Sequence, residues 1–94
     1  MSELTKVTNA TGSFWYNADG ELHNDTEPAI EWANGTKEWR SHNQLHRLDG
    51  PAIEWPNGDK AYFVNNQLHR EDGPAVDWVN GHQEYWINGE KVDQ

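Results

Sequence analysis

The chain of 94 residues contains no cysteine, so it has neither a disulfide framework nor thiolate chemistry. Serine is limited to Ser2, Ser13 and Ser41, and the sequence has no Gly-x-Ser-x-Gly string and no glycine-rich phosphate loop. No apolar stretch approaches the length of a membrane span, and the N-terminal segment has no apolar signal core. These absences predict a soluble, non-enzymatic protein of the cytoplasm (of the host-cell cytoplasm if viral), without catalytic residues, cofactor or metal.

Basic residues are also scarce: seven Lys and Arg stand against sixteen Asp and Glu, which gives a formal charge of −9. This balance argues against binding to nucleic acid or to an anionic membrane, because both require Lys and Arg. It favours a protein partner with a basic surface. The apolar fraction of 34% and the mean hydropathy of −1.08 predict a thin core. Six Trp, three Tyr and two Phe nevertheless supply large packing groups that disordered chains lack.

The chain repeats one pattern every 23 residues, without an insertion. The positions in step are Leu22-His23, Leu45-His46 and Leu68-His69; Pro28, Pro51 and Pro74; Trp32, Trp55 and Trp78; and Trp39, Tyr62 and Tyr85. The repeat predicts a single domain over residues 1–94, with units at about 1–23, 24–46, 47–69 and 70–94. The first and last units are degenerate, as expected of caps, since a stacked array must end in a polar face.

Each unit has the pattern of β-structure. Residues 52–55 alternate between apolar and polar, and Asn57-Gly58 then gives the strongest short hairpin signal. Residues 60–64 are expected to form the returning strand. Asn65-Asn66 then forms a second tight turn from residues that tolerate positive φ. The predicted fold is all-β, a single elongated, twisted antiparallel sheet of about four stacked 23-residue β-hairpin repeats. Such an array leaves two open strand edges, through which a homodimer can form.

The pattern aromatic-x-x-Asn-Gly/Asn-x-x-His, followed by Gly and later by Asn-Gly at the 23-residue period, resembles the MORN repeat. The chain also carries the more specific repeated string Leu-His-Arg-x-Asp-Gly-Pro-Ala. This string is most similar to a divergent MORN-like form met in phage, bacterial and large-virus proteins. The likeness runs from about Ser13 to Gln94, with Arg-x-Asp-Gly-Pro in place of the family's short Gly-x-Gly. The resemblance implies an elongated sheet of stacked hairpins and a role in scaffolding or protein binding.

A two-residue turn at Asn57-Gly58 would pair Ile53 with Tyr62, and Glu54 with Ala61 on the opposite face, because side chains alternate across a strand. Along the array, one face would then carry a stripe of apolar and aromatic side chains, which we interpret as structural. The stripe consists of Ile30, Ile53, Val76, Trp32, Trp55, Trp78, Trp39, Tyr62 and Tyr85. An aromatic binding groove is the alternative interpretation.

The opposite face would carry carboxylates in a strip about 20–25 Å long, at about 4.8 Å per strand. The strip consists of Glu31, Glu38, Glu54, Asp77 and Glu84, and Glu27 in the preceding loop extends it. The hypothesis is that these carboxylates bind the partner. The alternatives are a solvated face that prevents edge-to-edge aggregation and a cation site, for which rigid strand residues are poorly suited.

The string after each leucine places an imidazole, a guanidinium and a carboxylate together, and we interpret it as structural. Its members are His46, Arg47, Asp49 and Gly50, and again His69, Arg70, Asp72 and Gly73. We expect Asp to cap the turn, Arg to pair with Asp, and His to pack on an aromatic ring such as Tyr62 or Trp39. A row of anion-binding arginines is the alternative. The repeated histidines would lie about 9–10 Å apart over two ladder steps, too far to share a zinc ion.

Two functions remain. The first is a small stand-alone interaction or inhibitor protein, built of MORN-like repeats, that presents an acidic face to a protein partner. The alternative is a nucleic-acid mimic of the kind that phages encode, which blocks the basic cleft of a host nuclease or defence complex. An electrostatic mimic should lose its partner steeply as salt increases, whereas a hydrophobic contact should persist.

Overall fold

The computed structural model describes residues 4–92, and these residues form strands, turns and bends but no helix. The strands are β1 (Thr5–Asn9), β2 (Gly12–Tyr16), β3 (Ile30–Trp32), β4 (Lys37–Glu38), β5 (Arg40–Ser41), β6 (Gln44–Leu45), β7 (Ile53–Glu54), β8 (Lys60–Ala61), β9 (Phe63–Val64), β10 (Gln67–Leu68), β11 (Val76–Asp77), β12 (Gln83–Ile87) and β13 (Glu90–Val92). The prediction of an all-β fold is confirmed. Within the described range there is accordingly no helix long and apolar enough to cross a membrane.

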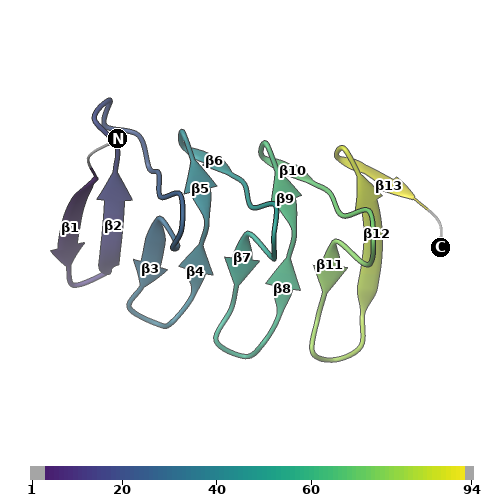
Figure 1. Ribbon diagram of the computed structural model, residues 1–94. Coiled ribbons are helices and arrows are strands. Elements are labelled where there is room, and N and C mark those ends of the chain that lie inside the picture. The colour runs from purple at the N-terminus through teal and green to yellow at the C-terminus, as the bar shows by residue number, and fades with distance from the viewer. Residues whose placement is uncertain (1–3, 93–94) are drawn as a thin grey trace.

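Most of the strands belong to one large antiparallel sheet. Its order is β1-β2-β3-β4-β7-β8-β11-β12-β13, and β5–β6 and β9–β10 form two further two-stranded ladders. Figure 1 shows the hairpins β1–β2, β3–β4, β7–β8 and β11–β12 standing side by side from the N-terminal to the C-terminal end. The molecule measures 41 × 26 × 16 Å, so the sheet is elongated and thin.

Two-residue turns join β5 to β6, β9 to β10 and β12 to β13, at the top in Figure 1. At Asn65-Asn66 the flanking residues Val64 and Gln67 pair directly, and both turn residues have positive φ (50° and 69°). His42-Asn43 and Asn88-Gly89 form the same turn at their own positions. Two positive φ angles are typical of a type I′ turn, whose twist matches that of the strands it joins. The predicted tight turn at Asn65-Asn66 is confirmed.

The turn that joins β7 to β8, at the opposite end of the sheet, is longer than the sequence predicted. The Trp55 N–H donates to the Asp59 carbonyl and the Gly58 N–H donates to the Trp55 carbonyl, both at 3.0 Å. The loop between Trp55 and Asp59 therefore holds three residues and has Gly58 at φ 99°. As a result Ile53 pairs with Ala61.

The predicted register is therefore wrong by one residue: Glu54 pairs with Lys60 and not with Ala61. Local chemistry accounts for the difference. Pro56 fixes φ for the first position of a type I turn, and the Asn57 Oδ1 accepts the N–H of Asp59 at 3.0 Å. A type I turn followed by a left-handed residue is the usual three-residue hairpin loop.

The shifted register changes which side chains share a face, because a slip of one residue inverts a whole strand. One row across the sheet, here called the apolar row, consists of Phe14, Ile30, Glu38, Ile53, Ala61, Val76 and Glu84. The adjacent row, on the opposite face, is called the charged row. It consists of Ser13, Glu31, Lys37, Glu54, Lys60, Asp77 and Gln83. The predicted carboxylate strip is therefore divided between the two faces.

The predicted aromatic stripe is divided as well. Arg47 contacts both the Trp39 ring and the Glu54 carboxylate, which places Trp39 on the face of the charged row and away from Ile30. Trp32, by contrast, donates its indole N–H to Glu38 of the apolar row.

The core consists of small side chains. Ala29, Ala52 and Ala75, which follow the repeated prolines, are fully buried at 0% exposure. Ile30 and Val76 are buried beside them, whereas Ile53 is half-buried. The aromatic residues of the predicted stripe are all half-buried. The tightest packing therefore lies at the Pro-Ala positions, to which the sequence pattern had assigned no core role.

Candidate functional surface

The charged row alternates in sign across the sheet. Reading along it, Glu31 is followed by Lys37, Glu54, Lys60 and Asp77. Opposite charges directly across a ladder stabilise each other by about 0.2–1 kcal/mol per pair. This face is therefore largely neutralised and does not form the continuous negative strip that was predicted.

Two of the predicted binding carboxylates lie on the other face and are held by neighbours. Glu38 accepts hydrogen bonds from the indole N–H of Trp32 and from the Arg40 Nε, both at 2.8 Å. Glu84 lies 2.8 Å from the His82 Nε2 and accepts the indole N–H of Trp86 at 2.9 Å. These contacts, with His82 foremost and Trp86 next, hold the pKa of Glu84 below its usual value. Both carboxylates are therefore engaged in contacts within the sheet.

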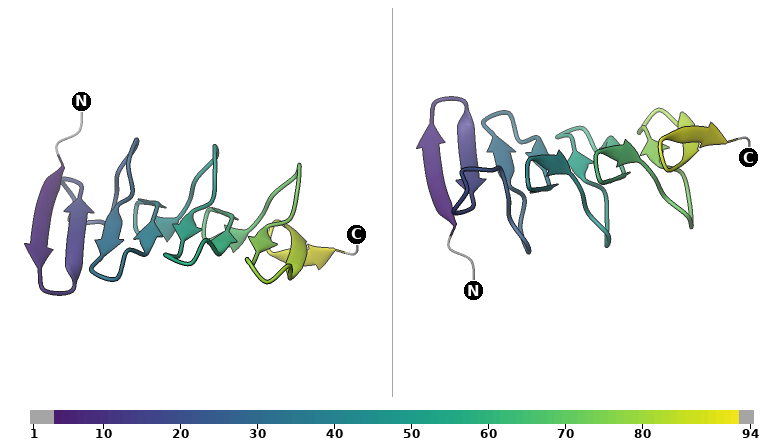
Figure 2. Two further views of the ribbon diagram at one scale, coloured as in Figure 1. Left: turned by 90° about the horizontal axis from the view of Figure 1, so that it is seen from below. Right: turned by 90° about the horizontal axis from the view of Figure 1, so that it is seen from above.

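Five exposed carboxylates lie in three loops, residues 24–28, 47–51 and 70–74, which we call the acidic loops; Asp19, Glu31 and Glu90 are exposed elsewhere. Figure 2 shows the acidic loops projecting from the same side of the sheet, one behind the other along its length. Their outermost carboxylates are strongly exposed. The exposed side-chain fractions are 67% for Asp25, 88% for Asp49, 80% for Glu71 and 89% for Asp72, and Glu27 is exposed as well.

An arginine connects the second acidic loop to the sheet. The Arg47 guanidinium lies 3.8 Å from the centre of the Trp39 ring, and its Nη1 donates to the Pro51 carbonyl at 3.0 Å. Its Nε donates to Asp49 at 3.1 Å, so the predicted Arg–Asp pairing is confirmed. The third loop repeats the arrangement. There Arg70 lies 4.1 Å from the Tyr62 ring and donates to Asp72 and to the Pro74 carbonyl.

The aromatic rings to which histidine was assigned therefore carry arginine. The same contact explains the repeated glycine of the loop. A Cβ on Gly50 would lie 2.8 Å from the Arg47 Cζ, and a Cβ on Gly73 would lie 2.9 Å from the Arg70 Cζ. A side chain at either position would therefore require the guanidinium to shift.

An open groove of about 590 Å³ separates the second and third acidic loops. Its floor contains Tyr62 and Val64, and its walls carry Leu48, Asp49 and Asp72. Leu48 is 80% exposed at the tip of its loop. The groove thus combines an apolar floor with acidic walls, and its arginines are already engaged by aromatic rings and carboxylates. The alternative of a free anion-binding arginine row has no support in these contacts.

The first acidic loop lacks arginine and is organised differently. The Asn24 Oδ1 accepts the N–H groups of Thr26 and Glu27, both at 3.2 Å. Asp25 lies 2.8 Å from the Nε2 of the buried His23. Glu27 remains exposed beyond these contacts, as the sequence hypothesis requires of a binding residue.

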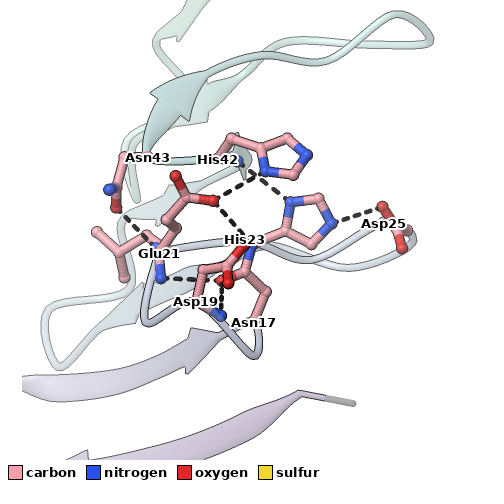
Figure 3. A network of polar contacts seen from close by, with 8 residues as sticks. Asn17, Asp19, Glu21, His23, Asp25, His42 and Asn43 are labelled. Atoms are coloured by element: carbon pink, nitrogen blue, oxygen red, sulfur yellow. Dashed lines mark hydrogen bonds and ion pairs between the residues drawn. The ribbon is translucent and has the colours of Figure 1, made fainter. Parts of the chain in front are cut away.

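Figure 3 shows the polar network around His23. The His23 Nδ1 accepts the backbone N–H of His42 at 3.2 Å, and the two imidazole rings lie 4.6 Å apart. The His42 Nδ1 lies 2.9 Å from Glu21. A hydrogen bond from Asn17, followed by that from His42, holds the pKa of Glu21 below its usual value. Among residues 4–92, no group of three His, Asp or Glu side chains is arranged to hold a metal ion.

Sequence reasoning thus placed Glu27 correctly at the surface, but it missed the exposed Asp25 and Glu71 and treated Asp49 and Asp72 as structural. The available signal was position. All four lie between Leu-His and Pro-Ala, where proline removes a backbone donor and no ladder bond is made, so their side chains are free to point outwards.

Comparison with protein-family models, curated proteins and solved structures found no match to this chain. Its function is therefore inferred from its own residues and geometry.

Proposed function

We propose that this chain is a non-enzymatic protein-binding module, built of four MORN-like repeats of 23 residues, that docks on a basic protein surface. One observation carries the proposal: five exposed carboxylates lie on three loops, and these loops project from the same side of the sheet. Charge complementarity of this kind raises association rates and selects partners more than it adds affinity.

The recurrence of whole contact sets supports the division into repeats. The pair Arg47–Asp49 recurs 23 residues later as Arg70–Asp72, and each arginine covers the aromatic residue at the equivalent position. A unit of a repeat array contacts mainly its neighbours, so equivalent residues make equivalent contacts. In this interpretation the function belongs to the row of loops and not to any single residue.

The nucleic-acid mimic has less support. It requires an unbroken row of carboxylates in place of phosphates, and Lys37 and Lys60 interrupt the row on the sheet. Glu38 and Glu84 lie on the opposite face, where neighbouring side chains hold them. A docking surface of separate acidic loops does not require that continuity.

A charge-matched pair of variants tests the proposal. The loop variant combines Asp25→Asn, Asp49→Asn and Asp72→Asn. The control variant combines Glu31→Gln, Glu54→Gln and Asp77→Asn, which removes three charges from the sheet. Proteins captured from extract of the native host would be compared at about 0.05 M and about 0.5 M salt. We expect only the loop variant to lose the captured partner at low salt. Equal retention by both variants, or equal loss, would disprove the role of the loops.

A further inference from the structure

The sheet ends in an open strand on its N-terminal side. β1 is the first strand in the sheet order and, among residues 4–92, it pairs only with β2. Figure 1 shows it at the N-terminal end of the row of hairpins. All five of its residues are exposed, whereas β13, at the other end of the sheet, has only three residues. β1 therefore offers the longer of the two open edges.

The hydrogen bonds of β2 show which backbone groups of β1 point outwards. The Trp15 N–H donates to the Ala29 carbonyl at 2.8 Å, and the Trp15 carbonyl accepts the His23 N–H at 3.0 Å. Both groups of Trp15 therefore point away from Lys6, its partner in β1. Because backbone groups alternate in direction along a strand, the N–H and C=O groups of Lys6 and Thr8 point away from the sheet. No strand in the described part of the chain pairs with them there.

An apolar side chain lies at the same edge. Val7 pairs with Phe14, which pairs with Ile30, so Val7 extends the apolar row into β1. Val7 is 43% exposed, and the neighbouring Leu4 is 37% exposed, whereas Ile30 is 3% exposed. A strand added to this edge would remove the exposed surface of Val7 from water, which is favourable by about 25 cal/mol per Å².

Charge favours this edge over the other for contact between two copies. The chain has a formal charge of −9, so two copies repel each other. Residues 4–16, which form the hairpin β1–β2, contain Lys6 and neither Asp nor Glu. The opposite end of the sheet carries Glu84 in β12 and Glu90 in β13. A second negatively charged copy can therefore approach the sheet with least repulsion at β1.

We propose that β1 pairs with β1 of a second copy, antiparallel and centred on Val7. Lys6 of each copy then lies opposite Thr8 of the other, and these residues exchange both of their backbone hydrogen bonds. The two Val7 side chains meet between them as the close, non-hydrogen-bonded pair. A register centred on Lys6 would instead place two like charges opposite each other, which is unfavourable.

The symmetry of this pairing determines where the acidic loops lie in the dimer. An isologous contact between antiparallel strands of one sheet has its two-fold axis perpendicular to the sheet. The acidic loops of both copies therefore project from the same side. A basic partner that contacts one set of loops would meet the second set at high effective concentration. This last consequence depends on the proposed function, whereas the pairing itself does not.

The dimer should be weak and should become stronger with salt. One strand from each copy forms the contact, so we expect a Kd between about 10 μM and about 1 mM. Salt screens the repulsion between two chains of charge −9, so the Kd should decrease between about 0.05 M and about 0.5 M salt. Docking of the acidic loops on a basic partner should weaken over the same range. The two proposals can therefore fail independently.

Sedimentation equilibrium up to about 1 mM chain tests the pairing. Val7→Lys places two lysines opposite each other at its centre, as edge strands do to prevent association. Val79→Lys is the matched control, because it makes the same change of charge at a valine that is 62% exposed between β11 and β12. We expect the wild type and Val79→Lys to dimerise alike, and Val7→Lys to have a Kd raised at least about tenfold.

Three results would overturn the proposal. They are a wild type that is still monomeric at about 1 mM, a Val7→Lys chain that dimerises as the wild type does, and species larger than a dimer. Larger species would show head-to-tail pairing of β1 with the C-terminal edge, which does not close.

Two measurements keep the proposal testable if Val7→Lys does not fold. The N–H groups of Lys6 and Thr8 face solvent in the monomer and are bonded in the dimer, so their exchange protection in the wild type should increase with chain concentration. Thr8→Pro removes an outward N–H at an edge position that tolerates proline, and it should raise the Kd. Exchange at Lys6 and Thr8 that does not depend on concentration, or an unchanged Kd in Thr8→Pro, would contradict the pairing.

Discussion

The Arg47 guanidinium lies over the Trp39 ring, 3.8 Å from its centre, while its Nε donates to Asp49 in the same loop. One side chain thus connects an aromatic residue of the sheet to an exposed carboxylate. Its own side chain is only 23% exposed. The second acidic loop is therefore attached to the sheet through Arg47, and loss of this attachment can be measured as a loss of folding stability.

Arg47→Lys should destabilise the fold by about 1–2 kcal/mol, because lysine keeps the charge but lacks the planar fork that stacks on Trp39 and reaches the Pro51 carbonyl. Urea unfolding measures the change. Lys37→Arg, at an exposed position of the charged row, serves as the control and should stay within about 0.5 kcal/mol of the wild type. An Arg47→Lys chain as stable as this control would show that the stacking contributes nothing.

Gly50→Ala should destabilise the chain through Arg47 and not through the backbone. The added Cβ would lie 2.8 Å from the Arg47 Cζ and force the guanidinium away from its partners. In an Arg47→Ala background that conflict is absent, so the cost of Gly50→Ala should shrink by about 0.5–3 kcal/mol, the usual range for contacting residues. A double-mutant cycle measured by urea unfolding gives this difference, and additive effects would refute the explanation.

Ala52→Val tests the alanine core. Ala52 is completely buried, so two extra methyl groups should overpack the site and cost about 1–3 kcal/mol. Ala33→Val is the matched control, because Ala33 is exposed and Val79 already occupies the equivalent position 46 residues later. Thermal unfolding compares the two variants. Equal melting temperatures would mean that the Pro-Ala positions are not the tight part of the fold.

Acid should weaken the fold through Glu84. Its pKa is lowered in the folded chain by the hydrogen bonds from His82 and Trp86, so the stabilisation is present above the ordinary carboxyl pKa. It is lost as the pH falls below about 4.5 and through the lower folded value. Unfolding midpoints at several acid pH values should therefore depend less on pH in Glu84→Gln. Glu31→Gln, at an exposed position, should behave as the wild type does.

The sequence predicted the all-β class and the second turn, because both depend on local chemistry. Asn65 and Asn66 tolerate positive φ, and their conformation follows from this property alone. The strand register, by contrast, could not be predicted from local chemistry alone. Asn57-Gly58 is compatible with a two-residue and a three-residue loop, and the longer one also forms at Ala33 and Val79, where proline is absent. The contact of the Asn57 Oδ1 with the Asp59 N–H, which Asn34 and Asn80 repeat in their units, favours the longer loop.

The one additional residue in this loop determines which side chains form the candidate site. With the shorter loop the carboxylates would form one continuous strip, whereas with the longer loop Lys37 and Lys60 enter the row and most of the exposed carboxylates lie in the acidic loops. The sequence pattern also did not predict the contact between Arg47 and the Trp39 ring. Sequence spacing placed an aromatic ring, an imidazole and a guanidinium near one another without showing which of the two side chains would cover the ring.

The most direct test of the account is the strand register, measured by interstrand nuclear Overhauser effects between backbone protons. The account predicts cross-peaks that connect Glu54 with Lys60 and Lys37 with Glu54. Cross-peaks that instead connect Glu54 with Ala61 and Ile53 with Tyr62 would restore a continuous acidic face to the sheet, and would contradict the assignment of partner binding to the acidic loops.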